Sequence, residues 1–354
     1  MGWVLGIEIG GTKLQLAIGT GMQPAFRALW RGRVDPARGA AGIRAQIRSA
    51  LPELLGQAGI DARELQRVGI AFGGPVDSAR GTVIESHQVA GWTGFPIVDW
   101  FREELGLAAV LQNDADSAAL AEARFGAGQG FDPVLYLTVG SGIGGGLIVG
   151  GKIYRGSGLG AVEIGHLRPG GLPRHVPLSD SLTVEEIGSG FGMANRARRV
   201  IAEHRETREY LARQFGEADP RRTSVDPAFR ESTAAGAERF EKLLALADEN
   251  PERITAALVA RAARQGDRLS NELLSDATAA IGWAIAQAVT LLNPARIVIG
   301  GGVSLIGEEL FFAPIRRAVR QYVFPPFADV AETVPASLGE EVVLYGATAL
   351  AAGN

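Results

Sequence analysis

The stretch VLGIEIGGTKLQLAI, residues 4–18, decides how this sequence is expected to fold. Residues 4–9 and residues 14–18 each show the apolar pattern of a β-strand, and a Gly-Gly pair separates them. Glycine pairs favour tight turns between antiparallel strands, because glycine adopts backbone conformations that other residues avoid. We therefore predict a β-hairpin over residues 4–18.

A second stretch, residues 134–149, repeats this arrangement. Its sequence VLYLTVGSGIGGGLIV places one apolar run before a glycine-rich segment and another after it. A shorter echo links GIAFGGPV at residues 69–76 with IVIGGGV at residues 297–303, where each apolar strand ends in glycines. Because both elements recur in the same order, we predict a duplicated domain whose equivalent turns face one another across a cleft.

Helical patterns separate these strands. Helical spacing of apolar residues is found in residues 43–55, 98–105, 115–125 and 273–292. The third segment opens after Asn113-Asp114, and Asn293-Pro294 ends the fourth. Strands that alternate with helices predict an α/β protein.

The composition indicates a two-domain protein. The chain has 354 residues, 46% of them hydrophobic, which is long for a single core. It contains 48 glycines and no cysteine, which excludes disulfides, thiol nucleophiles, iron–sulfur clusters and cysteine-ligated zinc. The formal net charge of −4 comes without a basic block that nucleic acid could bind. No apolar run reaches the roughly 18 residues that a membrane span needs.

The first residues lack the basic and apolar regions of a signal peptide, so we expect a soluble, cytoplasmic protein. We place a smaller α/β domain over residues 1–113 plus 338–354 and a larger one over residues 114–337. Residues 202–253 are rich in charged side chains and interrupted by proline. We interpret them as a solvated helical insertion in the larger domain.

The loop at residues 140–145 matches the spacing GxGxxG, but it fails the test for a dinucleotide site. That fingerprint requires a helix after the turn, whereas the residues that follow here are strand-like. No GxxxxGK[ST] phosphate loop occurs either. The glycine pairs could serve only as tight turns, but backbone N–H groups in such hairpins can also approach phosphate oxygens. In that case Thr12 and Ser141 supply hydroxyls for a transferring phosphoryl group.

Five motifs together resemble the ROK family of repressors, open reading frames and sugar kinases. They are GIEIGGTK at residues 6–13, NDA at 113–115, SGIGGG at 141–146, EIGH at 163–166 and GGGVS at 300–304. The resemblance covers nearly the whole chain apart from the charged insertion. It implies a duplicated actin-like ATPase (ribonuclease H-like) fold, with ATP and a hexose in the interdomain cleft. The family's repressors carry a helix-turn-helix domain before the first motif, which here begins at the N-terminus, so we expect a kinase.

The resemblance assigns Asp114 as the general base that accepts the proton of the attacking sugar hydroxyl. Asn113 would hold another hydroxyl, although Asn113-Asp114 is also a common helix cap. Asp116 is less suited as the base, because it points to another side of the helix. The residues expected at the sugar are Gly74, Gln88, Asn113, Asp114, Glu163, His166 and Glu185.

The resemblance places the nucleotide on the glycine loops. The residues expected around it are Gly10, Gly11, Thr12, Lys13, Ser141, Gly142, Gly144, Gly300, Gly301 and Gly302. Mg²⁺ is expected with ATP, held mainly by phosphate oxygens and water, so no side chain is assigned as a direct metal ligand. Glu8 could hold a magnesium-bound water or could be a hydrogen-bonded turn carboxylate.

Three features depart from the family pattern. Gln88 stands where sugar kinases usually have Asn, and Val162 stands where a small residue is common. The cysteine-rich zinc segment that usually follows His166 is replaced by residues 167–178, which contain three prolines. We therefore expect no structural zinc, since a pair of His166 and His175 would lack a third ligand.

The sequence thus predicts an ATP-dependent kinase that phosphorylates a hexose, with glucose at its 6-hydroxyl as the first choice. Mannose, fructose or an N-acetylhexosamine as the sugar, and polyphosphate as the donor, stay open. The alternative from another class is a non-catalytic sugar-binding regulator, which would have no need of a base at position 114. The expected partners are the sugar and ATP, without nucleic acid or membrane, in a homodimer.

Overall fold

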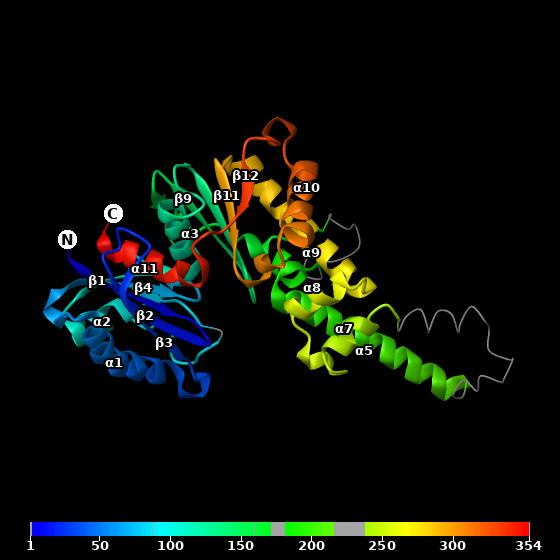
Figure 1. Ribbon diagram of the computed structural model, residues 1–354, viewed down its shortest axis with the longest axis horizontal. Helices are drawn as coiled ribbons and strands as arrows, with labels where there is room; N and C mark the ends of the chain where they lie inside the picture. The colour runs from blue at the N-terminus through cyan, green and yellow to red at the C-terminus, as the bar shows by residue number, and fades with distance from the viewer. Residues whose placement is uncertain (1, 87, 159, 171–180, 216–237, 354) are drawn as a thin grey trace.

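The computed structural model describes residues 2–86, 88–158, 160–170, 181–215 and 238–353, and it contains two five-stranded sheets (Figure 1). The first sheet comprises β1 (Trp3–Ile9), β2 (Lys13–Gly19), β3 (Phe26–Arg33), β4 (Leu65–Phe72) and β7 (Ala108–Asn113). The second comprises β8 (Val134–Val139), β9 (Ile143–Val149), β10 (Lys152–Ile153), β11 (Arg296–Gly300) and β12 (Glu332–Pro335). The strands β5 (Val76–Asp77) and β6 (Thr82–Val83) form a separate pair.

Helices connect and cover these strands. The α-helices are α1 (Gly39–Ala58), α2 (Ile97–Leu105), α3 (Asp114–Phe125), α4 (Val184–Gly188), α5 (Gly190–Phe215), α7 (Glu241–Leu246), α8 (Ala256–Arg264), α9 (Arg268–Leu292), α10 (Ala313–Tyr322) and α11 (Val342–Ala352). Shorter helical turns include η3 (Ile164–His166), η5 (Pro251–Arg253), η6 (Gly302–Ile306), η8 (Pro325–Phe327) and η9 (Gly339–Glu341). None of the helices described is both long enough and apolar enough to cross a membrane.

The two sheets have the same topology, which confirms the predicted duplication. Their strand orders are β3-β2-β1-β4-β7 and β10-β9-β8-β11-β12. The first long strand of each sheet pairs antiparallel with the next one in sequence and parallel with the strand on its other side. Both predicted hairpins are therefore present, and the glycine-ended strands β4 and β11 occupy equivalent positions.

Two helices join the sheets. The C-terminal helix α11 packs against β1 and β4, α3 packs against β8 and β9, and the two helices contact each other (Figure 1). Glycine makes these contacts possible, because a Cβ atom at Gly69 would lie 1.9 Å from the Ala347 carbonyl oxygen. A Cβ atom at Gly346 would likewise lie 1.9 Å from the Ser117 carbonyl oxygen. The start of α3 is thus held firmly between the two halves.

The turn of the second hairpin is shorter than its glycine-rich sequence predicts. The sequence places the glycine-rich residues 140–146 between two apolar runs, but β9 begins at Ile143 and includes three of these glycines. Helix α3 crosses this strand closely, since a Cβ atom at Gly146 would lie 2.8 Å from the Ala119 Cβ atom. Close approach of a helix, rather than a turn, therefore requires glycine in this strand.

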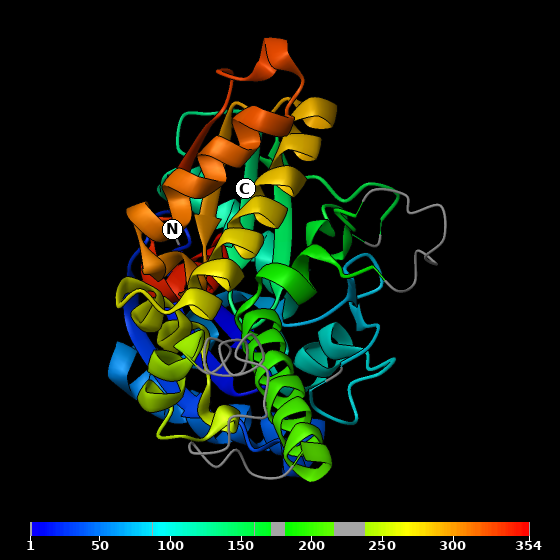
Figure 2. The ribbon, with the colours of Figure 1, turned by 90° about the vertical axis from the view of Figure 1, so that its right-hand side faces the viewer.

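The outer faces of both sheets carry the apolar cores. Helices α1 and α2 pack on the first sheet, while α9 covers the second and contacts α8 and α10. Figure 2 shows α9 and α10 side by side in front of the second sheet. This arrangement leaves the inner side of each sheet to α3, α11 and the glycine-rich turns.

The charged segment at residues 202–253 differs from its prediction. Helix α5 begins at Gly190 and runs past position 202 without interruption, and residues 216–237 lie outside the described part. Phe240, Leu243 and Leu244 are buried in the core of the second half. Residues 202–210 of α5 are mostly exposed, as a solvated helix predicts, so the expectation is wrong only where Phe240, Leu243 and Leu244 pack into the core.

A buried carboxylate binds the segment that connects β12 with α11. Glu122 on α3 is fully buried, and one of its oxygens accepts hydrogen bonds from the backbone N–H groups of Ser337 and Leu338, both at 2.9 Å. Its other oxygen accepts from the Ala127 N–H at 2.8 Å. These bonds satisfy a charge that burial alone would disfavour. The domain limits that we expect from sequence, between 113 and 114 and between 337 and 338, stay predictions.

Candidate active site

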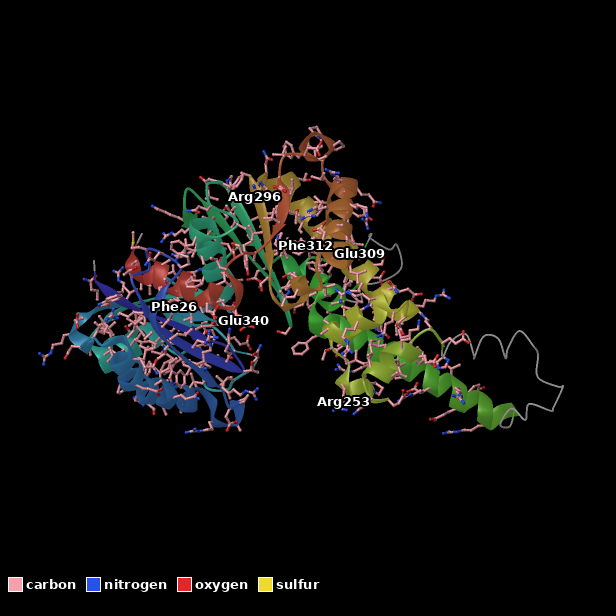
Figure 3. The ribbon with its side chains drawn as sticks, viewed as in Figure 1. Phe26, Arg253, Arg296, Glu309, Phe312 and Glu340 are labelled. Carbon is pink, nitrogen blue, oxygen red and sulfur yellow. The ribbon has the colours of Figure 1, made fainter. Side chains whose placement is uncertain are left out.

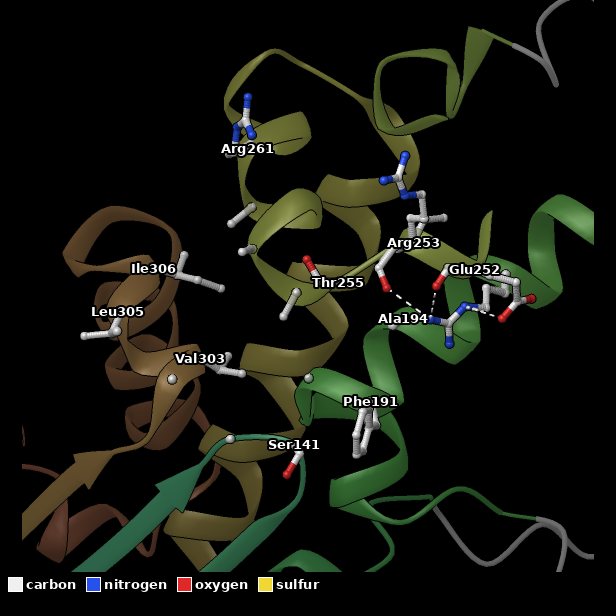
Figure 4. Close-up of a pocket in the computed structure, with 18 of the residues that line it drawn as sticks. Ser141, Phe191, Ala194, Glu252, Arg253, Thr255, Arg261, Val303, Leu305 and Ile306 are labelled. Atoms are coloured by element: carbon white, nitrogen blue, oxygen red, sulfur yellow. Dashed lines mark hydrogen bonds and ion pairs between the residues drawn. The ribbon is translucent and has the colours of Figure 1, made fainter. Parts of the chain in front are cut away.

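Two adjoining cavities lie where the glycine-rich turns of the two sheets meet. The smaller cavity has a volume of about 460 Å³. Residues from both halves line it, among them Lys13, Asp114, Thr138, Gly301, Gly302 and Glu340. Glu340 lies between the two halves in Figure 3. The larger cavity, about 780 Å³, shares Gly302 and Leu305 with the smaller one (Figure 4). The two cavities therefore lie on either side of the turn that follows β11.

Asp114 lies at the wall of the smaller cavity, at the first position of α3. Its Oδ1 atom accepts a hydrogen bond from the Ala115 N–H at 2.8 Å. Burial raises the pKa of the Asp114 carboxyl, while the Ala115 N–H and the charge of Lys13 oppose this increase. A carboxylate whose pKa is raised is a stronger base, and Asp114 is still partly accessible from the cavity. Its environment suits proton transfer.

Glu8 and Lys13 form an ion pair at the turn of the first hairpin. The Lys13 Nζ atom lies 2.8 Å from Glu8 Oε1, and the Glu8 side chain is almost completely buried. Burial raises the pKa of Glu8, and the charge of Asp114 raises it further, whereas Lys13 lowers it. No described residue donates a hydrogen bond to the Glu8 Oε2 atom. This buried oxygen is therefore an acceptor without a partner among the described residues.

Asn113 caps helix α3, as the sequence predicts. Its Oδ1 atom accepts hydrogen bonds from the N–H groups of Ala115 at 2.8 Å and Asp116 at 3.4 Å. Its Nδ2 group donates to the Gly74 carbonyl oxygen at 3.1 Å, which connects α3 with the end of β4. Asn113 also lines a third, small cavity of about 20 Å³ together with Glu163. Residues of both halves thus meet here.

Asp116 faces this small cavity rather than the one that contains Asp114. It is 4% exposed; its Oδ2 atom accepts from Gln112 Nε2 at 2.6 Å, while Oδ1 has no partner among the described residues. Gln112 Oε1 in turn accepts from Arg155 Nη2 at 2.9 Å. Burial raises the pKa of Asp116 to about 6, and the charges of Asp114 and Glu163 add to this, whereas the Gln112 hydrogen bond and Arg155 lower it.

Asp116→Asn should stabilise the protein at neutral pH. Between about pH 4 and pH 6 the folded state of the wild type retains a proton that the unfolded state has lost, so its stability falls as pH rises. A shift of about two pKa units corresponds to at most about 3 kcal/mol, which the amide removes. Urea unfolding of both proteins from pH 4 to pH 7 measures this. The difference between variant and wild type should grow across the window, and an equal difference at every pH would contradict the assignment.

Glu163 precedes the short helical turn η3, His166 is its last residue, and both are exposed. Glu163 lines the small cavity with Asn113, whereas His166 lines none of the cavities described here. Val162 precedes them with φ at 65°, a conformation in which a β-branched residue is strained. Glycine alone would avoid that strain, because it has no Cβ atom. Of the loop at residues 167–182, residues 171–180 lie outside the described part, and His175 is among them.

Glu185 binds the second glycine loop in this structure. Its Oε2 atom accepts a hydrogen bond from the Ile143 N–H at 2.6 Å. A Cβ atom at Gly142 would lie 2.5 Å from the same oxygen, so a larger residue there would displace the end of the Glu185 side chain. Glu185 therefore fixes the loop that contains Ser141, while its place at a sugar stays a prediction.

The glycine turns have distinct local roles. The Gly10 N–H donates to the Lys13 carbonyl at 2.9 Å and closes the first turn. The Gln88 side chain lies over Gly11, where an added Cβ would be 1.5 Å from its Oε1 atom. Thr12 is exposed at this turn. Gly144, in β9, packs against Ala115 rather than lying in the turn itself.

The turn after β11 separates the two cavities. Gly301 has φ at 87°, and a Cβ atom there would lie 2.5 Å from the Val139 carbonyl oxygen. A Cβ atom at Gly302 would meet no protein atom within 4 Å and would project into free space. At Gly300, by contrast, a Cβ atom would collide with the Tyr136 hydroxyl at 2.6 Å. Packing therefore requires glycine at position 300, and packing together with the positive φ angle requires it at position 301. At Gly302 the absence of a side chain leaves open space beside the turn.

Several residues that line the cavities lie outside the motifs found in the sequence. Phe191, Arg261 and Leu305 border the larger one, and Glu340 borders the smaller one. Phe191 could have been noticed in the sequence, because it is an apolar residue that directly follows Ser189-Gly190 at the start of a helix. Among the residues that the structure describes, no three His, Cys, Asp or Glu side chains lie close enough to hold a metal ion.

Comparisons with known proteins agree with this architecture. The sequence pattern of the ROK family matches residues 4–354. A glucokinase of Halalkalibacterium halodurans is 31% identical over 348 residues, which cover 97% of this chain and 93% of that protein. The crystal structure of a ROK family glucokinase from Streptomyces griseus, in complex with glucose and AMPPNP, is 30% identical with a TM-score of 0.72, and 99% of each chain is covered. A ROK hexokinase from Thermus thermophilus is 26% identical with a TM-score of 0.72, covering 99% and 97%.

The fold and the cavities define a class of protein with the duplicated actin-like ATPase fold, whose ligand cavities lie between two similar halves. The chain belongs to the ROK family.

Proposed function

We propose that this protein is an ATP-dependent sugar kinase that transfers the γ-phosphoryl group of ATP to the 6-hydroxyl of glucose. The observation that carries the proposal is the position of Asp114 at the wall of a cavity that glycine-rich turns from both halves surround. Relatives named glucokinase that match almost the whole chain support the sugar and the donor, as does the relative solved with glucose and AMPPNP.

In the proposed reaction Asp114 accepts the proton of the sugar hydroxyl as the hydroxyl oxygen attacks the γ-phosphorus. The bond between that phosphorus and the bridging oxygen of ADP breaks, and the sugar phosphate forms. Asn113, Glu163, His166 and Glu185, with Gly74 and Gln88, are proposed to hold the other sugar hydroxyls, because rings of this kind offer both donors and acceptors. Closure of the two halves would exclude water from the transfer.

The residues at the first turn suit a magnesium complex of the nucleotide. The Glu8 Oε2 atom lacks a protein donor and could accept a hydrogen bond from a magnesium-bound water. Lys13 lines the smaller cavity and could pair with phosphate oxygens there. Mg²⁺ would neutralise phosphate charge, while Glu8 would contact the metal-bound water and Lys13 the phosphate oxygens. The proposed enzyme is a homodimer and is located in the cytoplasm.

A panel of sugars and donors tests this function. The purified chain is incubated with glucose, mannose, fructose, N-acetylglucosamine or N-acetylmannosamine, each with ATP or polyphosphate, and sugar phosphate is measured. We expect the highest kcat/KM for glucose with ATP. Preference for another sugar or for polyphosphate would replace the named substrate, whereas sugar binding without turnover in every combination would favour a non-catalytic regulator. Light scattering of the same sample measures the oligomer.

A further inference from the structure

We propose that Glu122 is a positioning residue for phosphoryl transfer, which holds the chain segment between β12 and α11 in register with Asp114. This inference rests on the proposed function, since the segment lines the cavity in which the transfer would occur. Glu122 itself lines neither of the two adjoining cavities, and none of the motifs found in the sequence includes it. Its effect on the reaction would therefore be transmitted through the backbone that it binds.

The chain passes between the two sheets at two places, and helix α3 takes part in both connections. The first connection leads from β7 of the first sheet into α3, whose first residue is Asp114. The second leads from β12 of the second sheet to α11, which packs on β1 and β4 of the first sheet (Figure 1). Because Glu122 on α3 binds this second connection, one helix carries the proposed base and also holds the returning chain.

Glu122 binds the second connection through backbone groups. Its Oε1 atom accepts hydrogen bonds from the N–H groups of Ser337 and Leu338, and the side chain is fully buried. The preceding N–H group, that of Ala336, donates to the Ile299 carbonyl oxygen at the end of β11, at 2.9 Å. Three consecutive N–H groups therefore attach this segment to the second half. The two bonds to Glu122 are charge-assisted and shielded from water, which makes this attachment strong.

The attached segment forms part of the wall of the smaller cavity. Ala336, Gly339 and Glu340 line this cavity together with Asp114. Figure 3 shows Glu340 between the two halves. Glu122 lies eight residues after Asp114 on the same helix, a distance of about 12 Å along its axis. Helix α3 thus connects the proposed base rigidly with the part of the wall that Glu122 holds.

A candidate pivot for movement of the two halves lies directly after the attached residues. Gly339 has φ at 70°, and a Cβ atom there would meet no atom within 4 Å, so packing restricts this residue little. Two residues later, Glu341 forms an ion pair with Arg31 on β3 of the first sheet. The backbone up to Leu338 is therefore attached to the second half, while Glu341 is attached to the first. Closure about Gly339 would leave the bonds of Glu122 intact.

A purely structural role for Glu122 is the alternative. Its Oε2 atom accepts from the Ala127 N–H just beyond the end of α3, and this bond alone would serve to end the helix. The contacts at Gly126 extend further, because a Cβ atom there would lie 2.1 Å from the Glu122 Oε2 atom and 2.9 Å from the Ser337 hydroxyl oxygen. The two roles differ in their consequences: loss of a structural bond lowers stability alone, whereas loss of positioning also lowers kcat.

The test compares Glu122→Gln with Asp267→Asn on the full chain. Asp267 is also a buried carboxylate with one local and one distant backbone donor, the N–H groups of Ser270 at 2.8 Å and Leu243 at 3.1 Å. It lines none of the cavities described. Both variants should lose stability in urea, because each new amide group faces an N–H donor.

The kinetic constants separate the two variants. We expect kcat for sugar phosphorylation to fall about 10- to 100-fold in Glu122→Gln, since misplacement of reacting groups by about 1 Å can cost this much. In Asp267→Asn it should fall less than about 2-fold. The KM of glucose should change only a few-fold in both, because the segment that Glu122 holds contains none of the residues proposed at the sugar.

Leu338→Pro tests the same contact from the backbone side. Proline removes one N–H donor but leaves Glu122 bonded to Ser337 and Ala127, and the φ of −90° at Leu338 is close to the range of proline. The kcat of this variant should also fall, by less than that of Glu122→Gln. It keeps the proposal testable if Glu122→Gln does not fold.

Distances between the halves provide a readout that needs no turnover. Because the chain has no cysteine, Gln57→Cys on α1 and Arg317→Cys on α10 place two spin labels at exposed positions. Without ligand, the label distances should be more broadly distributed in Glu122→Gln than in the wild type or Asp267→Asn. Equal distributions, or equal kcat of Glu122→Gln and Asp267→Asn, would overturn the inference. Failure of the proposed function is separate, because the wild type would then phosphorylate no sugar while the label distances still test what Glu122 holds.

Discussion

Asp114→Asn should reduce kcat for sugar phosphorylation about 100- to 10,000-fold, the range that general-base catalysis contributes. The amide cannot accept the hydroxyl proton, but its oxygen can keep the hydrogen bond that the Ala115 N–H donates at 2.8 Å. Helix α3 should therefore remain capped and the sugar should still bind. Steady-state kinetics gives kcat, and calorimetry with glucose gives the Kd, which we expect to change only a few-fold.

Asp116→Asn provides the matched control for this substitution. It makes the same chemical change two residues along the same helix, at a carboxyl that faces a different cavity. Its kcat should fall less than 10-fold, because Asp116 has no expected contact with the attacking hydroxyl. Near-normal turnover of Asp114→Asn, or an equal loss in both variants, would refute Asp114 as the base.

Gly346→Ala should cause the largest loss of stability, about 3 kcal/mol or more, because overpacking at a backbone contact leaves no side chain that can move. The new Cβ atom would lie 1.9 Å from the Ser117 carbonyl oxygen on α3. Helices α11 and α3 would have to separate, and Asp114, which begins α3, would move with them. Urea unfolding measures the free-energy change, and kcat should fall in parallel.

Gly56→Ala is the control for the same change in a helix without a close neighbour. A Cβ atom at Gly56, near the end of α1, would meet no atom within 4 Å. This variant should be more stable than the wild type by up to about 1 kcal/mol, since alanine restricts the unfolded chain and favours helix. A stability of Gly346→Ala equal to that of Gly56→Ala would show that the two helices are not in the contact described.

Features with a local cause were predictable. The hairpin of β1 and β2 follows from apolar runs on either side of a Gly-Gly pair, and the same pattern predicts β8 and β9. The Asn113 cap follows from its side chain, which accepts from N–H groups two and three residues on. In each case the interacting residues are neighbours in the chain, so their spacing is visible in the sequence. Because these elements recur in the same order along the chain, the duplication could also be predicted.

Features with a distant cause were not predictable. Phe240 and Leu243 lie in a charged segment whose composition indicates a solvated surface, but contact with distant helices buries them. The glycines within β9 looked like turn residues, because the helix that crosses them is specified elsewhere in the chain. Glu185 and Ile143 are separated by 42 positions, and no local spacing indicates their hydrogen bond.

The sequence by itself determined the two glycine hairpins, the capped helix that begins at Asp114 and the duplication, since each depends on backbone preferences within a few residues. Only the tertiary structure decided which side chains face a cavity. It separated Asp114 from Asp116, left the Phe191 ring exposed beside Ser141, and joined Glu122 to Leu338 across 216 positions. The physical reason is that burial, exposure and long-range hydrogen bonds arise when distant segments pack, and packing fixes them for each residue separately.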